Sequence, residues 1–408
     1  MSIIDEMRTD EPWDSFLDYK RKTAKDYTDI MQTQSFIVNR RYRPIVESIA
    51  AGTYVFRDTY MIQIPKGNGK FRKIFSLKRD EDVSEAIVIQ VMSHLLKKYE
   101  KYTCPNLCSV PKNGGVETVM IGLSKIENLE NKYFFKFDIT NYGNSIPLDK
   151  LFATIDKYFD ACDAPIATVI KQILSNPNVL IRKDGQLVPY REEFKGAMTG
   201  LPFTNILSSL YLNEMDWYYY NMGKPYYRFN DDVSIICDSQ EDAETQKAYV
   251  VNYITEMGLT SNGDKMQIVK PGEMTSYLGI KISGSELSIN DKTIKRYKNK
   301  MKKRSKQLRI KVNNGEITNE MAFDMMIRYT SNILYGVNDE SRSFMKTYFM
   351  RINSSKNLSK IDHYAQFYIR YAYTGKYSDQ NIQRVPYQML RDHGYVPLVS
   401  AYRTFRRK

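Results

Sequence analysis

Apolar and polar positions recur with regular spacing along the chain, and the spacing predicts its elements. Polar helices are expected over Ser15–Ile49, with Asp14 and Ser15 as a plausible cap. Two strands are predicted next, joined by the Gly-rich basic tip Pro65–Lys70. The expected strands are Tyr54–Ile64, Phe71–Leu77, Tyr133–Ile139, Tyr226–Phe229, Val233–Cys237 and Met274–Ser283, and the expected helices are Asp82–Tyr99, Leu148–Phe159, Pro202–Tyr220 and Ala243–Met257.

From Asp291 onward the pattern becomes helical and basic. Residues 291–408 carry 25 basic and 9 acidic side chains, an excess larger than the net charge of +13 of the whole chain. The positive charge is therefore confined to the last third, which is typical of a segment that binds a polyanion. Eighteen consecutive apolar residues occur nowhere, so no membrane span is expected.

The cysteines and the N-terminus point to an ordinary cytoplasmic protein. The polar, acidic start of the chain resembles neither a secretory signal nor a transit peptide. Four cysteines are too few for a disulfide framework in 408 residues. Cys104 and Cys108 have no second pair at zinc spacing, so ordinary thiols are expected.

Three carboxylates carry the strongest chemical signal. Asp231 and Asp232 are adjacent at the tip of a predicted hairpin, where like charges repel. Asp138 ends a very apolar strand, a position at the rim of a sheet. A solvated turn would explain the hairpin alone, but a bound divalent cation explains all three, because hard cations take carboxylate oxygens.

The ordered segments resemble the palm of a reverse transcriptase. The resemblance covers about residues 60–285 and is specific as an ordered set. The segments that carry it are IPKGNGKFRKIF, FKFDITNYGNSI, GAMTGLPFTNILSSLYLNEMD, RFNDDVSII, GLTSNGDKMQI and SYLGIKIS. It implies an α+β right-hand polymerase with fingers, a palm of antiparallel sheet and helices, and a helical basic thumb. The implied domains are an N-terminal helical extension (1–53), fingers (54–132), palm (133–288) and thumb with C-terminal region (289–408).

Within that family the chain is most similar to bacterial defence-associated enzymes, the abortive-infection or unknown-group type related to retron and group II intron reverse transcriptases. The Arg before the aromatic-x-Asp-Asp motif, Arg228, is part of that likeness. The resemblance implies an RNA template, expected to be a structured non-coding RNA, together with a DNA product and nucleoside triphosphates. It also implies two Mg²⁺ ions, or Mn²⁺ in their place.

The resemblance also implies roles for individual residues. The metal ligands would be Asp138, Ile139, Asp231 and Asp232, with Lys265 as the acid that protonates pyrophosphate. Lys66 and Arg72 would neutralise the triphosphate, and Tyr142, Gly143, Thr199, Gly200 and Phe229 would border the nucleotide and template. Of these, Asp232 is the less certain ligand, since successive residues on a strand point to opposite faces.

Two positions depart from the family pattern. Thr199 stands where many relatives have a glutamine that packs near the template and the incoming base. Gly143 stands where an aromatic side chain usually excludes ribonucleotides, and Tyr142 comes one residue early. Either Tyr142 forms the gate through a shifted loop, or discrimination between sugars is weak.

The first segment after the palm predicts a nucleic-acid contact. Ile294, Tyr297, Met301 and Leu308 form one helical stripe, and the other faces carry eleven Lys and Arg between residues 292 and 311. We expect the stripe to pack inward and Lys298, Lys302 and Lys306 to bind phosphates.

Three other functions fit parts of the sequence. A catalytically inactive nucleic-acid-binding polymerase fold would not need all three aspartates. An RNA-dependent RNA polymerase shares the palm, but the Phe-Asn-Asp-Asp hairpin and the fingers sequence favour reverse transcription. A protein-primed or template-independent polymerase of the abortive-infection kind stays open, since 32 tyrosines offer hydroxyls.

Overall fold

The computed structural model describes most of the chain. The described residues are 1–24, 26–67, 69–79, 82–176, 178–183, 186–190, 196–261, 266–337, 343–378 and 380–407, with the side chains of residues 66, 67 and 70 left out. No helix in these ranges has the length and apolar character that spanning a lipid bilayer requires.

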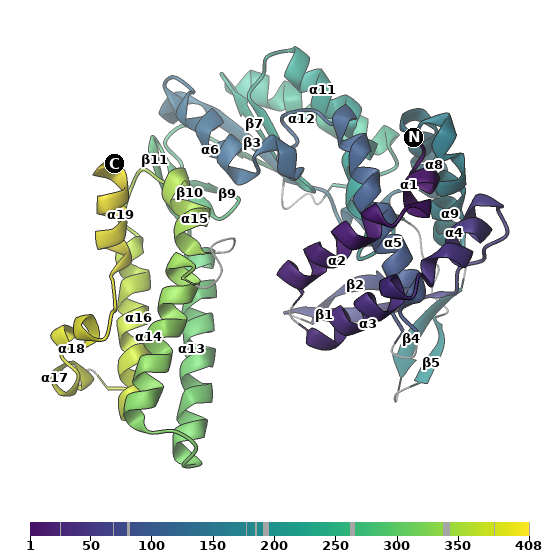
Figure 1. Ribbon diagram of the computed structural model, residues 1–408. Coiled ribbons are helices and arrows are strands. Elements are labelled where there is room, and N and C mark those ends of the chain that lie inside the picture. The colour runs from purple at the N-terminus through teal and green to yellow at the C-terminus, as the bar shows by residue number, and fades with distance from the viewer. Residues whose placement is uncertain are drawn as a thin grey trace. The chain divides into compact units, whose positions relative to one another are not determined.

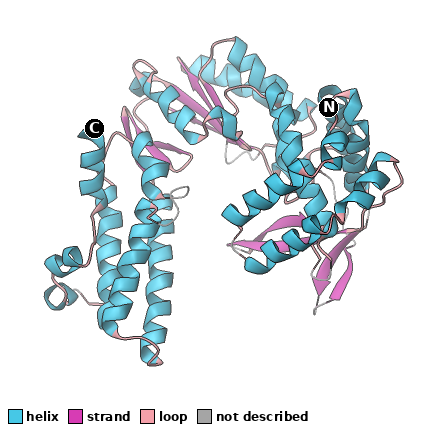
Figure 2. Cartoon of the chain, in the orientation of Figure 1, coloured by secondary structure: helices cyan, strands magenta, loops and turns pink. Residues whose placement is uncertain are grey.

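The chain divides into two compact units. Unit 1 comprises Met1–Asn113, Phe135–Cys237 and Glu241–Ile268, and unit 2 comprises Gly114–Phe134, Asp238–Gln240 and Val269–Lys408. Helices and mainly antiparallel sheets alternate along the chain (Figure 2), which confirms the predicted α+β class. The predicted domain boundaries after residues 53, 132 and 288 stay predictions.

The first sheet of unit 1 contains the strands next to the three predicted carboxylates, Asp138, Asp231 and Asp232. Its strand order is β6-β7-β3-β8. The strands are β3 (Tyr133–Asp138), β6 (Tyr226–Phe229), β7 (Asp232–Cys237) and β8 (Gln267–Val269). The pattern predicted the first three to within a residue or two, because their apolar runs are short and bounded by polar residues.

The second sheet of unit 1 is built on the predicted basic hairpin. Its strands are β1 (Thr59–Gly67), β2 (Lys70–Ser76), β4 (Val179–Lys183) and β5 (Gln186–Tyr190), in the order β2-β1-β4-β5. β1 pairs with β2 antiparallel and with β4 parallel. β4 and β5 were not predicted, since their short sequences show neither strict alternation nor a long apolar run.

The N-terminal helices are shorter and more numerous than predicted. They are α1 (Ile3–Arg8), α2 (Glu11–Thr23), α3 (Tyr27–Val38) and α4 (Tyr42–Ala50). The predicted cap at Asp14 and Ser15 is wrong, because α2 begins at Glu11 with Pro12 in its first turn. Ser2 and Asp5 cap α1 reciprocally, and Trp13 stacks on Tyr42 with ring centroids 4.0 Å apart.

The long helix predicted over Pro202–Tyr220 is two helices. α10 ends at Tyr211 and α11 begins at Asn213, with Leu212 between them at φ −104° and ψ 16°. The Asn213 side chain donates to the carbonyl of Tyr102 at 2.9 Å and accepts from the Cys104 N–H at 3.2 Å. The remaining α-helices of unit 1 are α5 (Ser84–Leu95), α7 (Tyr142–Ser145), α8 (Leu148–Tyr158), α9 (Ala164–Ser175), α10 (Thr204–Tyr211), α11 (Asn213–Asn221) and α12 (Gln240–Glu256).

Unit 2 contains a small sheet where one strand was predicted. The segment Met274–Ser283 is divided into β9 (Thr275–Tyr277) and β10 (Ile280–Ser283), which pair antiparallel, and β11 (Glu286–Ile289) follows. The reversal occurs at Leu278 (φ 48°) and Gly279 (φ 87°). Gly279 was the available turn signal, and the leucine beside it at positive φ is an unusual residue for that conformation.

Three helices of unit 2 lie side by side, α13 (Asp291–Asn313), α14 (Asn319–Tyr335) and α16 (Leu358–Thr374), as Figure 1 shows. The predicted apolar stripe of α13 is buried. The other α-helices of unit 2 are α6 (Val116–Ser124), α15 (Phe344–Tyr348), α17 (Asn381–Arg384), α18 (Tyr387–Asp392) and α19 (Leu398–Arg407). Short 3₁₀ helices in the described ranges include η1 (Leu96–Tyr102), η2 (Pro111–Asn113), η3 (Leu129–Asn131), η4 (Ala161–Asp163) and η7 (Phe349–Arg351).

Candidate active site

Two of the predicted carboxylates lie at one edge of the first sheet. Asp138 is the last residue of β3, and β7 is the neighbouring strand. The N–H of Ile139 donates to the carbonyl of Asp231 at 3.3 Å. The backbones that carry Asp138 and Asp231 are therefore hydrogen-bonded neighbours, although the two residues are 93 positions apart in the sequence.

The hairpin tip presents its two aspartates differently. Phe229 and Asp232 are the last paired residues of β6 and β7, so Asn230 and Asp231 form the turn, with Asn230 at φ 57°. Asp231 is partly buried, whereas Asp232 is exposed. Burial lowers the pKa of Lys136 on β3, while the negative charge of Asp232 acts in the opposite direction. The positive charge that interacts with Asp232 is therefore that of Lys136, which lies on the same strand as Asp138.

The donor set fits a hard divalent cation only in part. Carboxylate oxygens of Asp138 and Asp231 are suitable ligands, and Mg²⁺ is commonly held by one or two carboxylates plus substrate phosphates. In the part of the chain that the structure describes, no three His, Cys, Asp or Glu side chains form a group that could hold a metal ion. The predicted roles of Ile139 and Asp232 as ligands stay predictions.

A buried ion pair anchors the hairpin to α11. Arg228 on β6 donates from Nε to Asp216 Oδ1 at 2.7 Å and from its second terminal nitrogen to Oδ2 at 2.5 Å, and both side chains are fully buried. Tyr226 donates to the same carboxylate at 2.6 Å. Burial opposes the charge of Arg228, but the charge of Asp216 outweighs it and raises the pKa of the guanidinium above its usual value.

The same guanidinium also holds the backbone of the turn. Its terminal nitrogens donate to the carbonyl of Asn230 at 3.2 Å and to the carbonyl of Ser209 in α10 at 3.0 Å. Four of the five N–H donors of the guanidinium are therefore used on fixed partners. One side chain links β6, the turn, α10 and α11, and so sets where Asp231 lies.

The loop around Cys104 and Cys108 pairs with β6 from the other side. Arg228 donates its N–H to the carbonyl of Asn106 at 3.0 Å, and the Cys108 N–H donates to the carbonyl of Arg228 at 2.8 Å. Burial raises the pKa of the Cys104 thiol to about 11 and that of Cys108 to about 12. Both thiols are buried, and a raised pKa favours their protonated form at neutral pH.

The turn that carries Thr199 is joined to the β1–β2 hairpin through Asn144. The Asn144 side chain accepts from the Thr199 N–H at 2.7 Å and donates to the carbonyl of Lys73 in β2 at 3.3 Å. The Phe75 N–H donates to the carbonyl of Thr199 at 2.8 Å. Gly200 (φ 114°) lies so close to β2 that a Cβ would be 2.5 Å from Ile74 Cγ2, so only glycine fits.

Gly143 and Tyr142 occupy very different surroundings. A Cβ on Gly143 would lie 2.8 Å from Thr199 Oγ1 and 3.5 Å from Thr204 Cγ2. Tyr142 is 5% exposed and donates from its hydroxyl to the carbonyl of Ser208 at 2.6 Å. Burial raises the pKa of this phenol well above its usual value. The Tyr142 ring is thus part of the core, and Gly143 lies against the Thr199 turn.

The residues predicted to bind the triphosphate, Lys66 and Arg72, lie on the β1–β2 hairpin. Arg72 is exposed and pairs in register with Ile64. Lys66 belongs to β1, but its side chain is outside the described part, as is the whole of Lys265. Lys73 donates to the Tyr190 hydroxyl at 2.7 Å, so this lysine is engaged within its own sheet.

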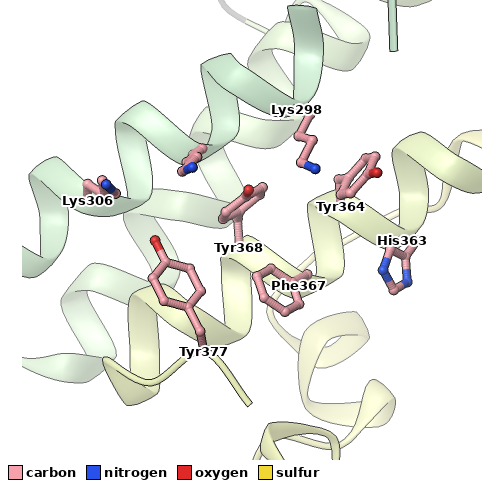
Figure 3. A pocket seen from close by; sticks show the side chains of 8 residues that line it. Lys298, Lys306, His363, Tyr364, Phe367, Tyr368 and Tyr377 are labelled. Carbon is pink, nitrogen blue, oxygen red and sulfur yellow. The ribbon is translucent and has the colours of Figure 1, made fainter. Parts of the chain in front are cut away.

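The predicted nucleic-acid contacts belong to unit 2. Lys298, Lys302 and Lys306 lie on one side of α13 and line a groove with α16 (Figure 3). Their role stays a prediction. The substrate-binding role of Phe229, half-buried at the hairpin, also stays a prediction.

Two positioning residues were missed from the sequence, Asn144 and Asp216. An aspartate within the apolar run before Trp217 and an arginine within the apolar strand YYRF were the available signal for the ion pair. Arginine and aspartate are almost never fully buried unless paired. Asn144 offered no comparable signal, because both of its partners are backbone groups distant in sequence.

A protein-family model described as reverse transcriptase (RNA-dependent DNA polymerase) matches residues 64–282. The matched segment contains every residue discussed above for the predicted catalytic and nucleotide sites. No curated protein matches the chain.

Solved polymerase structures are distantly similar to the chain. Apo telomerase from Candida tropicalis is 14% identical over 83% of this chain and 59% of its own, with a TM-score of 0.47. A form of that telomerase truncated from the C-terminal domain is 16% identical over 58% of this chain and 55% of its own, with a TM-score of 0.42. The BmCPV RNA-dependent RNA polymerase at the elongation state is 12% identical over 70% of this chain and 27% of its own, with a TM-score of 0.42. The chain thus spans less than two thirds of each of these three chains.

The buried ion pair predicts a large loss of stability when one partner is neutralised. Asp216→Asn leaves the Arg228 charge uncompensated in the core and should lower the free energy of unfolding of unit 1 by about 3–5 kcal/mol. Both tryptophans, Trp13 and Trp217, lie in unit 1, so tryptophan fluorescence during urea unfolding reports on this unit.

The matched control is Glu214→Gln on the same helix. Glu214 pairs with Lys157, and these side chains are 61% and 54% exposed, so the cost should stay below about 1 kcal/mol. Equal losses for the two variants would show that the ion pair does not anchor unit 1.

Proposed function

Because the chain belongs to the reverse transcriptase (RNA-dependent DNA polymerase) family, we propose that it extends a nucleic-acid 3′-hydroxyl with nucleoside triphosphates on an RNA template. The observation that carries the proposal is the bond between the Ile139 N–H and the Asp231 carbonyl, which makes the backbones carrying two carboxylates immediate neighbours at a sheet edge. Neighbouring carboxylates there suit the binding of divalent cations, whose positive charge would neutralise the negative charge of the reacting phosphates.

Asp138 and Asp231 are the residues that would hold divalent cations, Mg²⁺ or Mn²⁺. Bound at these carboxylates, two such ions would neutralise charge on the attacking and leaving oxygens. The protein's own contribution is positioning. Arg228 fixes the turn that presents Asp231, and β3 delivers Asp138 from the neighbouring strand.

Arg72 and the Thr199 turn would form the nucleotide side of the site. Arg72 is exposed on β2 and can bind triphosphate oxygens, with Lys66 on the other arm of the hairpin as its proposed partner. Asn144 fixes the Thr199 turn against the same strand. Binding of phosphates on the hairpin and positioning of the base beside the turn are therefore mechanically linked. Lys265 would protonate the departing pyrophosphate.

The biological role that we propose is bacterial antiphage defence with a structured non-coding RNA as template. Its support is the likeness of the Arg228–Asp232 hairpin sequence to retron-type enzymes. Sequencing the nucleic acid that co-purifies with the protein tests this proposal. A single structured RNA with complementary DNA would support it, whereas untemplated DNA attached to protein would favour the protein-primed alternative.

The carboxylates predict a graded loss of activity. Asp138→Ala and Asp231→Ala should each lower primer extension by roughly 1,000-fold or more, because several kcal/mol of transition-state stabilisation are lost. Asp232→Ala should cost less, since Asp232 is exposed at the start of β7. Extension of an RNA–DNA template–primer with labelled nucleotides, in Mg²⁺ and in Mn²⁺, measures these losses.

Glu241→Gln, an exposed carboxylate in the first turn of α12, is the control and should retain full activity. Near-normal extension by a folded Asp231→Ala variant would contradict the assignment of the hairpin as the active site. An inactive parent chain that still binds template–primer would favour the inactive polymerase fold.

Gly143 predicts weak discrimination between sugars. With a glycine beside Thr199 and with Tyr142 buried, the parent should favour deoxynucleotides by about 100-fold or less, because a site without a steric gate rejects an added hydroxyl poorly. Gly143→Ala should lower incorporation by displacing the Thr199 turn, and Thr199→Ala in the same chain should restore it. Single-nucleotide incorporation with paired dNTP and rNTP substrates gives both quantities.

Strong discrimination in the parent that disappears in Tyr142→Leu would instead identify Tyr142 as the gate. Failure of Thr199→Ala to rescue Gly143→Ala would show that their contact does not control the turn.

A further inference from the structure

The groove between α13 and α16 combines positive charge with open aromatic faces. It encloses about 370 Å³, near the lower end of the size of ligand pockets. Lys298, Lys302 and Lys306 line it from α13, and aromatic side chains of α16 and the segment after it line the opposite side (Figure 3). Among the described lining residues none is acidic.

The aromatic side is a stack of nearly parallel rings. Tyr377 lies over Tyr371 with ring centroids 3.9 Å apart and an angle of 8°, and over Phe367 at 5.8 Å and 15°. Tyr377 is 51% exposed. His363 lies one turn before Phe367, with its ring 6.5 Å away. Phe367 and Tyr371 are half-buried, so Tyr377 is the ring of this stack that is most exposed to water and available to a planar aromatic ligand.

The turn at the C-terminal end of α16 places Tyr377 beside the groove. α16 ends at Thr374, and its C-cap Gly375 has φ 71°. The guanidinium of Arg309 on α13 donates to the carbonyls of Ala372 and Tyr373 at 3.3 and 3.2 Å, and a Cβ on Gly375 would lie 2.8 Å from it. Arg309 thus caps the helix from α13, and the left-handed glycine returns the chain toward the groove. The ring stack is therefore built by fixed backbone geometry.

The lysines face this stack without competing acids. Lys298 lies 4.4 Å from the ring centroid of Tyr364, a cation–π distance. Within the described residues, Lys298, Lys302 and Lys306 form no ion pair with an acidic side chain. Asp362 of α16 is buried and accepts from the N–H groups of Leu398 and Val399 at 2.7 and 3.0 Å, so its charge is engaged elsewhere.

We propose that this groove binds an unpaired stretch of nucleic acid, with a base stacked on Tyr377 and Phe367 and its phosphates on the α13 lysines. Base faces are accessible to aromatic rings only when the strand is not paired, which distinguishes this mode from duplex tracking. The three lysines follow one another at about 6 Å along the helix. Lysines at this spacing can follow successive phosphates of one strand, and the aromatic rings beside them favour a strand whose base faces are exposed.

This proposal deepens the proposed function, since a polymerase handles both an unpaired template and a single-stranded product. Binding is measured without metal or nucleotide, so its outcome is independent of catalysis. Fluorescein-labelled single-stranded RNA, single-stranded DNA and a blunt RNA–DNA duplex of one sequence serve as probes in anisotropy titrations. A 2-aminopurine base in the single strands reports stacking by its quenching.

The ring variants are Phe367→Leu and Tyr377→Leu, which keep apolar bulk and remove the stacking face. Each should weaken single-strand binding about fivefold or more and relieve the 2-aminopurine quenching, with blunt-duplex affinity unchanged. Tyr387→Leu on α18, 40% exposed and outside the groove, is the matched control and should bind like the parent. Unchanged thermal unfolding of each variant shows that the fold is intact.

The lysine variants distinguish the effect of a positive charge in the groove from the effect of a positive charge elsewhere on α13. Lys302→Ala should weaken single-strand binding and reduce the slope of log affinity against log salt by about 0.7. Lys303→Ala, exposed on the same helix but outside the groove, should have a clearly smaller effect. Preference for RNA or for DNA in these titrations would identify the template or the product as the source of the strand.

Three results would overturn the proposal. The first is single-strand affinity that both ring variants leave unchanged. The second is an equal loss of blunt-duplex affinity in those variants, which would indicate duplex tracking. The third is that poly-glutamate displaces the strand while the ring substitutions do not change strand binding. This result would identify a site for an acidic peptide. If the parent chain binds single strands through the rings but never extends a primer, the proposal for the groove stands. Only the proposed polymerase activity is then contradicted.

Discussion

The buried pair of Arg228 and Asp216 is the constraint on which the arrangement of unit 1 depends. Removing two charges from water costs several kcal/mol for each ion, and only a bidentate geometry with further hydrogen bonds offsets that cost. The pair meets this condition, because Tyr226 also donates to the carboxylate and two backbone carbonyls accept from the guanidinium. If the hairpin were shifted by one residue, Arg228 and Asp216 would no longer meet and each charge would be buried without its partner. The pair therefore specifies one register of the hairpin.

Backbone hydrogen bonds do most of the assembly around the candidate site. Ile139 bonds to Asp231, Phe75 to Thr199, and Arg228 to Asn106, each through main-chain atoms. These main-chain bonds fix where the backbone that carries Asp138, Asp231 and Thr199 lies, in addition to the side-chain contacts of the Arg228–Asp216 pair.

The local sequence of apolar and polar residues predicted those elements whose boundaries depend on neighbouring residues alone. β3, β6 and β7 were recoverable because an apolar run of four to six residues ends at a polar residue. The break at Leu212 was not recoverable, since no glycine or proline marks it. The reversal at Leu278 and Gly279 does contain a glycine, but it was included in a single strand because the apolar pattern continues on both sides. The carboxylates were identified by chemistry and order, whereas Asn144 was missed because it binds only backbone groups of β2 and the Thr199 turn.

Asn144 also links the β1–β2 hairpin to the Thr199 turn. Its amide bonds to Lys73 and Thr199, and the Phe75 N–H donates directly to the Thr199 carbonyl, so β2 and the turn are joined at two points separated by one residue. A displacement of β2 would therefore displace the turn as well. Under the proposed function, the binding of phosphates on the hairpin and the placement of the base beside the turn would then change together.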